Sequence, residues 1–279
     1  MKTTLSIGYS PCPNDTRIFH ALASGLVGGP ETGFRVRLED VETLNSLALK
    51  GALDVTKISY GAVPAVLGRY CVLRAGGALG RGCGPLIVAR EPLSVEALKG
   101  RTIAIPGEQT TAYLLMRLRE PGLGGRAKAM PFDRIMHAVS SGEADAGLII
   151  HESRFTYREH GLVEVEDLGR WWEGETGLPI PLGCIVARRS LGPETIHRVD
   201  ALVRASLEYA ISHPEAASAY IREHATEMDE GVMQAHIALY VNEYSLDLGD
   251  EGVRAVEALF AMARARGLVS GGEGLPLFA

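Results

Sequence analysis

The chain has 279 residues, 46% of them hydrophobic, and a formal net charge of −6 with a pI near 5.8. This length and apolar content suit one large globular domain or two ordinary ones. The acidic balance and the scattered Lys and Arg residues argue against nucleic-acid binding, which needs a basic stripe, and no apolar run approaches the length of a membrane span.

The first predicted unit is a strand over residues 4–9, followed by the turn Ser10-Pro-Cys-Pro-Asn-Asp-Thr16 and a helix that runs to Ala23. Two prolines fix φ, and Asn14, Asp15 and Thr16 are good N-caps, so the turn is expected to be rigid. A helix N-terminus is also a natural anion site. We interpret Asn14 and Asp15 as capping residues, and keep Asn14 as an additional cleft candidate.

A second strand is predicted over Arg35–Glu42, with Thr43 capping the next helix and Asn45 as a second cleft candidate. The third strand, Val55–Ser59, contains Lys57 in an otherwise apolar run. A charge there is costly to bury without a partner, so Lys57 lies either at an exposed edge or beside an anionic ligand. Ser59 follows at the end of the strand, and its position favours the second interpretation, in which Lys57 lies beside a ligand.

The third strand has a copy later in the chain. Gly51-Ala-Leu-Asp-Val-Thr-Lys-Ile-Ser-Tyr60 matches Gly142-Glu-Ala-Asp-Ala-Gly-Leu-Ile-Ile-His151. The unit Leu5–Ser10 likewise resembles Thr102–Gly107. Repeated strand–helix units predict two α/β lobes whose strand ends face one cleft. A lone histidine at a strand end is equally consistent with a structural role, but the repeat favours His151 as a base facing the cleft.

The segment Gly107-Glu-Gln-Thr-Thr111 follows a strand over Arg101–Pro106 and leads into a helix over Ala112–Leu118. Two threonines at the positive end of a helix predict a carboxylate receptor, because hydroxyl and N–H groups gather there. Capping the helix needs only one threonine. The presence of a second threonine therefore favours a carboxylate-binding site over a simple N-cap.

Two similar extended segments, Gly84–Arg90 and Leu182–Arg188, are predicted to cross between the lobes as hinges. Lobe one then comprises residues 1–87 and 187–279, and lobe two residues 88–186. Helices are expected over 193–212, 214–224, 229–241 and 251–266, packed on lobe one. Their histidines are interpreted as surface or helix-end residues without a role: His197, His213, His224 and His236.

No metal site is predicted. The four cysteines lack C-x-x-C spacing, which argues against zinc and against a disulfide framework. His151-Glu152 does not continue into the zinc motif H-E-x-x-H, since Phe155 stands where the second histidine is required.

Several motifs together resemble the 1,4-dihydroxy-6-naphthoate synthase (MqnD) family of the futalosine route to menaquinone. They cover nearly the whole chain: Ser-Pro-Cys-Pro-Asn-Asp-Thr (10–16), Leu-Glu-Asp-Val-Glu-Thr-Leu-Asn (38–45), Lys-Ile-Ser-Tyr (57–60), Gly-Gly-Ala-Leu-Gly-Arg-Gly (76–82), Thr-Thr-Ala-Tyr (110–113) and Gly-Leu-Ile-Ile-His-Glu-Ser-Arg-Phe (147–155). One departure is Arg17, where the family pattern has Phe.

The resemblance implies an α/β, two-lobed periplasmic-binding-protein-like (type II) fold with a central cleft and two crossover segments. It implies a cofactor-free carbon–carbon lyase that converts cyclic dehypoxanthinylfutalosine to 1,4-dihydroxy-6-naphthoate and releases a small sugar-derived fragment. By motif matching, His151 resembles the family's proton acceptor. The implied substrate contacts are Lys57, Ile58, Ser59, Thr110 and Thr111, with Arg154 as a further cleft candidate.

Other classes remain open. The chorismate dehydratase of the same pathway shares the fold but is expected to lack the Ser-Pro-Cys-Pro-Asn-Asp-Thr turn. A non-catalytic carboxylate-binding protein for transport needs a signal peptide or anchor cysteine, and a regulator needs a helix-turn-helix before the first strand. Residues 1–9 show neither. We therefore expect a cytoplasmic enzyme with a small carboxylate substrate and no membrane partner. The sequence does not determine the oligomeric state, and a homodimer is one alternative.

Overall fold

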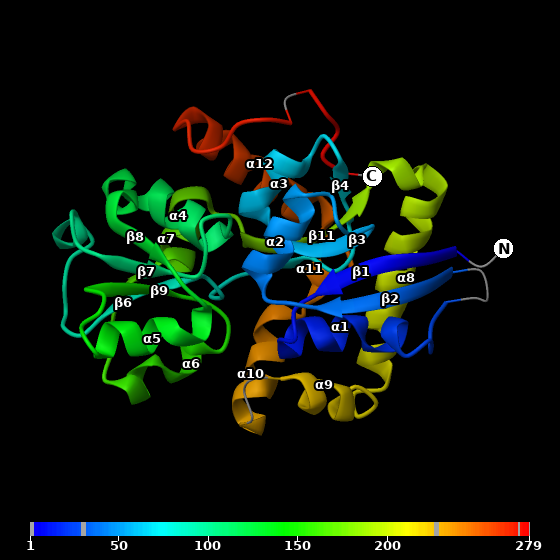
Figure 1. Cartoon of the computed structure of the whole chain (residues 1–279), viewed down its shortest axis with the longest axis horizontal. Coiled ribbons are helices and arrows are strands. Elements are labelled where there is room, and N and C mark those ends of the chain that lie inside the picture. The colour runs from blue at the N-terminus through cyan, green and yellow to red at the C-terminus, as the bar shows by residue number, and fades with distance from the viewer. Residues whose placement is uncertain (1–2, 29–31, 226–228, 273, 279) are drawn as a thin grey trace.

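The computed structural model describes residues 3–28, 32–225, 229–272 and 274–278, and places two β-sheets in two lobes with helices around each (Figure 1). In lobe one, the strands run in the order β2-β1-β3-β11-β4, and β5 pairs with β11. The bounds are β1 (Thr3–Tyr9), β2 (Thr32–Leu38), β3 (Val55–Ser59), β4 (Tyr70–Val72), β5 (Ala78–Gly80) and β11 (Ile180–Arg188).

The sheet of lobe two has the order β10-β6-β9-β7-β8. Its strands are β6 (Leu86–Ala89), β7 (Ile103–Ile105), β8 (Ala127–Ala129), β9 (Ala146–Ile149) and β10 (Val163–Asp167). The buried strands β6, β7 and β9 are continuous apolar runs, which is the pattern of strands covered on both faces.

The repeat seen in the sequence corresponds to the same arrangement in both lobes. In lobe one β3 is parallel to β1 and antiparallel to β11; in lobe two β9 is parallel to β7 and antiparallel to β6. Asp54 and Asp145, which occupy matching positions in the two repeated segments, have the same structural role in both lobes. Asp54 accepts a hydrogen bond from Ser6 N at 2.9 Å, and Asp145 accepts one from Thr102 N at 2.8 Å. Each carboxylate thus ties the start of its strand to the neighbouring parallel strand.

Helices cover the faces of the sheets. Lobe one carries α1 (Pro13–Ala23), α2 (Val41–Leu49) and α3 (Val63–Val66), and lobe two carries α4 (Thr111–Arg119), α5 (Phe132–Ser140), α6 (Ser153–Thr156) and α7 (Leu168–Thr176). After β11 the chain continues as α8 (Pro193–Ser212), α9 (Ser218–His224), α10 (Glu230–Tyr240), α11 (Glu243–Leu246) and α12 (Gly249–Ala265).

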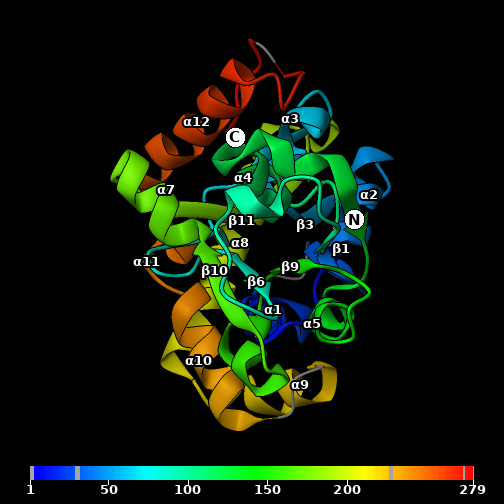
Figure 2. The same cartoon turned by 90° about the vertical axis from the view of Figure 1, so that its left-hand side faces the viewer.

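The C-terminal helices pack on lobe one, as predicted. Helices α8, α9 and α10 contact α1, and α12 contacts β11. Helix α12 also reaches α4 of lobe two. In both views α10 lies beside the end of lobe two that carries α6 (Figure 1, Figure 2). The C-terminal helices therefore bring residues far along the chain to the boundary between the lobes.

Some predicted bounds are wrong. Strand β2 ends at Leu38, not Glu42, because Asp40 caps α2 by accepting hydrogen bonds from Glu42 N and Thr43 N. Helix α1 begins at Pro13 after Cys12, so Asn14 and Asp15 lie in its first turn instead of capping it. Arg17 is directed toward α8, where its guanidinium donates to Ala210 O.

The segments expected to cross between the lobes are themselves strands, β6 and β11, each paired within one sheet. The predicted boundaries 87/88 and 186/187 therefore fall inside strands. We propose that the lobes are joined at 81–85 and 177–179, because a strand belongs to the sheet with which it is hydrogen-bonded.

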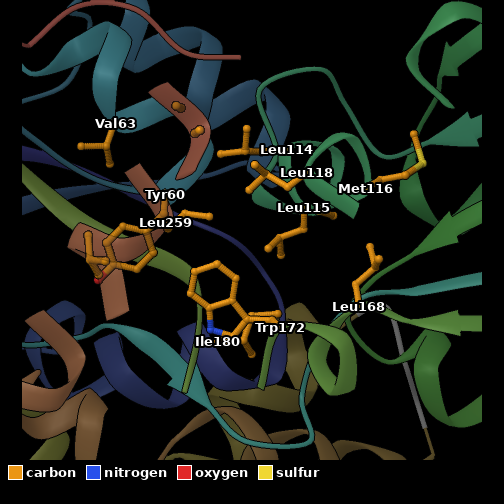
Figure 3. Packing of buried hydrophobic residues seen from close by; sticks show 14 of the residues in the cluster. Tyr60, Val63, Leu114, Leu115, Met116, Leu118, Leu168, Trp172, Ile180 and Leu259 are labelled. Atoms are coloured by element: carbon orange, nitrogen blue, oxygen red, sulfur yellow. The ribbon is translucent and has the colours of Figure 1, made fainter. Parts of the chain in front are cut away.

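A hydrophobic cluster joins the lobes on the side of α4 and α12 (Figure 3). Leu115 of α4 and Trp172 of α7 lie in the same cluster as Tyr60 and Leu259 of lobe one, and all four are 0% exposed. Burial on this scale contributes about 1.5–3 kcal/mol per large apolar side chain. The lobes are therefore held together by packing, and the cleft lies beside this cluster. Within the described residues, no helix is both long and apolar enough to cross a membrane.

Candidate active site

A pocket lies between the carboxyl ends of β1 and β3 in lobe one and the ends of β7 and β9 in lobe two. Its empty volume is about 660 Å³, which includes space open to solvent. Seven predicted site residues line it: Asn14, Lys57, Ile58, Ser59, Thr110, Thr111 and His151. The other lining residues are Ser10, Asp15, Val41, Ala78, Cys83, Pro85, Ala112, Ile150, Leu182, Gly183 and Tyr240.

Lys57 forms a buried ion pair with Asp15. Its Nζ lies 2.9 Å from Asp15 Oδ1 and donates to Gly76 O at 3.1 Å, and the two side chains are 6% and 4% exposed. Asp15 also accepts a 2.8 Å hydrogen bond from the hydroxyl of Ser10. The alternative of an exposed edge is therefore wrong, while the contact with an anionic ligand stays a prediction. A protein carboxylate already compensates Lys57, which still faces the pocket.

Ser59 is held by Asn45 at the end of β3. Asn45 Oδ1 accepts from Ser59 N at 2.9 Å, and Asn45 Nδ2 donates to Ser59 Oγ at 3.2 Å. Because Ser59 Oγ accepts this bond, its own proton is available for a ligand oxygen. Asn45 is 0% exposed and is not among the described residues that line the pocket, so it supports the site from behind.

The two threonines stand at the N-terminus of α4, but their hydroxyls are already used. Thr110 is the N-cap; its Oγ1 accepts from Tyr113 N and donates to Gly107 O at 2.7 Å. Thr111 Oγ1 donates to Leu182 O at 2.6 Å and accepts from Gly61 N at 3.0 Å, which links the lobes. The first backbone N–H groups of a helix have no intrahelical acceptor. A carboxylate would therefore bind the N–H groups of Thr111 and Ala112, not the hydroxyls.

His151 directly follows β9 and is partly exposed to the pocket. Its φ of 55° makes it the non-glycine residue with left-handed backbone in the described part of the chain. Such strain costs about 1–3 kcal/mol and tends to occur at functional sites. Burial lowers the pKa of His151 below its ordinary value, and the Glu152 carboxylate opposes that shift in part. The imidazole is therefore neutral at pH 7 and can accept a proton.

His236 joins the site, which corrects the prediction of a surface or helix-end residue without a role. It is 0% exposed and its ring lies against that of His151, with centroids 5.9 Å apart. The signal was present in the sequence: Met233, His236, Ile237 and Tyr240 follow the spacing of one buried helix face. By contrast, His197 and His213 are exposed and His224 is at the end of α9.

Arg154 lies away from the pocket. It pairs with Asp167 at 2.7 Å and donates to Gly84 O, and it is not among the described lining residues. It therefore fastens α6 to Asp167 at the end of β10 and to Gly84, which lies between β5 and β6.

Among the residues that the structure describes, one group of side chains has a spacing compatible with a metal ion. Donor atoms of Cys12, His151 and Glu152 lie within 4.8 Å of one another. Burial raises the pKa of the Cys12 thiol well above its ordinary value, and the Glu152 carboxylate raises it further. A protonated thiol is a poor metal ligand, since the thiolate is the binding form.

The fold and site define a class: a two-lobed, periplasmic-binding-protein-like α/β protein with a small-molecule pocket between its lobes. Solved structures of this class include an alkanesulfonate-binding protein from Xanthomonas axonopodis bound to MOPS, with TM-score 0.72 and 16% identity over 96% of this chain and 95% of that one. A crystal structure of a protein from Archaeoglobus fulgidus has TM-score 0.88 and 36% identity, covering 95% of this chain and 98% of that one.

The chain belongs to the menaquinone biosynthesis family, whose model matches residues 5–265. Two curated relatives are both described as 1,4-dihydroxy-6-naphthoate synthase. The relative from Thermus thermophilus is 55% identical, over 95% of this chain and 96% of its own length. The relative from Streptomyces coelicolor is 51% identical, over 95% of each chain.

Proposed function

We propose that the chain is a 1,4-dihydroxy-6-naphthoate synthase, a carbon–carbon lyase acting on cyclic dehypoxanthinylfutalosine in menaquinone biosynthesis. The observation that carries the proposal is the position of His151, whose pKa burial lowers, at a pocket between two lobes in a chain 55% identical to a relative of that name. We further propose that the enzyme is cytoplasmic and needs no cofactor.

The chemistry fits the residues in the pocket. Breaking a carbon–carbon bond on the way to an aromatic product needs a base and a group that stabilises developing negative charge, while aromatisation supplies the driving force. His151 takes the proton and keeps it as an N–H, with the electron pair left on the substrate. Glu152 is the carboxylate next to the imidazolium that results, so it lowers the cost of the charge.

Substrate binding uses both lobes. The first N–H groups of α4 receive the substrate carboxylate, because the helix N-terminus carries partial positive charge. Lys57 and Ser59 of β3 donate to sugar oxygens, and Ile58 supplies an apolar contact. Asn45 holds Ser59 in the donating orientation.

Turnover of the pure protein tests the proposal. We expect cyclic dehypoxanthinylfutalosine to give a new naphthoate absorbance, with no change on incubation with chorismate. Product from chorismate alone would instead assign the dehydratase activity. Binding of the futalosine derivative without any product would indicate a carboxylate-binding protein.

A further inference from the structure

His236 of α10 touches His151 across the boundary between the lobes. The two imidazole rings are nearly parallel, with an interplanar angle of 3° and centroids 5.9 Å apart. His151 follows β9 of lobe two, whereas His236 belongs to a helix packed on α1 of lobe one. His236 is not among the described residues that line the pocket. It therefore contacts the base without being placed to contact substrate.

Asn14 determines which nitrogen of His236 carries the proton. Asn14 Nδ2 donates to Asp15 Oδ1 at 3.0 Å, so the amide oxygen is the atom that lies 2.9 Å from His236 Nε2. An amide oxygen can only accept, so Nε2 is the N–H of His236. Asp15 also holds Lys57. The ring of His236 is thereby anchored to the buried ion pair under the pocket.

The second nitrogen of His236 faces a carboxylate. Nδ1 lies 3.6 Å from Glu152 Oε2, and both atoms are buried without a hydrogen-bond partner among the described residues. With Nε2 protonated, a neutral ring presents a lone pair at Nδ1, so two acceptors face each other. A proton between His236 Nδ1 and Glu152 Oε2 would turn this contact into a hydrogen bond. One carboxylate, however, can balance the positive charge of only one of the two imidazoles.

We propose that His236 is a positioning residue for His151: the ring contact and the Asn14 anchor fix the base, and Glu152 limits the two imidazoles to one proton. The inference rests on the proposed function, in which His151 takes a proton from substrate. The proton leaves the substrate, becomes an N–H of His151, and its charge is balanced by Glu152. Because the two rings come from different lobes, the base is held in this way only while the lobes are together.

The charges around the pair favour a single proton, carried by His151. Around His151, Glu152, Asp15 and Asp40 favour the imidazolium and Lys57 opposes it, while the Cys12 thiol, whose pKa burial raises, is uncharged. Around His236 the neighbours are Glu152, His151 and the ring of Tyr240, with centroids 4.7 Å apart. Burial lowers the pKa of His236 well below its ordinary value, and His151 lowers it further.

Kinetics of His236→Phe provide the first test. Phenylalanine keeps a flat ring but cannot donate to Asn14 or face Glu152 with a nitrogen. We expect kcat to fall about 10- to 100-fold with KM within about twofold, since His236 does not line the pocket. The substitution removes the lone pair of His236 Nδ1 that faces Glu152, so the carboxylate is freer to balance a proton on His151 and the acid limb of kcat/KM moves to higher pH. The matched control is His197→Phe on the exposed face of α8, which should leave kcat, KM and the acid limb of kcat/KM unchanged.

Two kinetic outcomes decide the matter. A kcat within twofold of wild type, or a lower kcat with an unmoved acid limb, overturns the inference, because a merely structural role lowers activity without shifting the limb. If His236→Phe lacks a cooperative thermal transition, His236→Gln is measured by the same criteria.

Proton NMR of the ligand-free protein separates this inference from the proposed function, since it uses no substrate. The imidazole Cε1–H signal of His151, identified by its loss in His151→Gln, is followed from pH 5 to 9. We expect its midpoint to rise in His236→Phe and to stay in His197→Phe, with His236 not titrating in this range. An unchanged midpoint, or a freely titrating His236, contradicts the inference even if the enzyme makes naphthoate.

Discussion

The buried ion pair of Lys57 and Asp15 allows a quantitative prediction for Asp15→Asn. The substitution keeps the shape of the side chain but removes the charge 2.9 Å from Lys57 Nζ, in a place where the two side chains are 6% and 4% exposed. Removing one partner of a buried pair leaves an uncompensated charge and costs about 3–5 kcal/mol. We expect a loss of that size in the free energy of unfolding.

Urea unfolding followed by circular dichroism measures this loss as a shift in midpoint at constant m-value. The double variant Asp15→Leu, Lys57→Met should recover most of the stability, because replacing both charges by apolar groups is often neutral or stabilising. As a control, Arg222→Met removes the exposed pair with Glu230 and should change stability by less than about 1 kcal/mol. The reasoning is refuted if Asp15→Asn unfolds at the wild-type midpoint, or if the double variant is as unstable as the single one.

Three further predictions follow from the site. Thr111→Val removes the hydroxyl that bonds to Leu182 O and Gly61 N, so the thermal midpoint should drop by an amount equivalent to about 1–3 kcal/mol; an unchanged midpoint would show that these bonds between the lobes are dispensable. Asn45→Leu frees Ser59, so kcat/KM should fall about tenfold; a value equal to wild type in steady-state assays would refute the supporting role. Burial lowers the pKa of His236, so the unfolded chain binds more protons below about pH 6.5 and wild-type stability falls as pH drops. His236→Phe should lose less stability than wild type between pH 7 and 5 in urea titrations, and an equal loss would contradict the buried neutral ring.

The parts of the fold that depend on local pattern were predictable from the sequence. Strand β3 and helix α8 have the predicted bounds, because an apolar run after Asp54 and a proline at the first helical turn are local signals. The repeat of Gly51–Tyr60 at Gly142–His151 also predicted two similar sheets, since the two segments share the glycine, the aspartate and the apolar run that define the turn and the strand.

The contacts that the sequence did not predict depend on distant partners. His236 lies 222 residues along the chain from Asn14, and Lys57 lies 42 residues from Asp15, so neither contact has a local signal. The hydroxyl of Thr111 is used by Leu182, 71 residues away. Local pattern shows that a polar group needs a partner, but only the packed structure shows whether that partner is the protein or a ligand.

Comparison of substrate binding and turnover in His151→Gln tests the central claim most directly. Glutamine cannot accept a proton at neutral pH, and general-base catalysis contributes about 10²–10⁴-fold. The account predicts a Kd for cyclic dehypoxanthinylfutalosine near that of wild type and a kcat lower by at least about 100-fold. A variant that binds normally and turns over at the wild-type rate would contradict it.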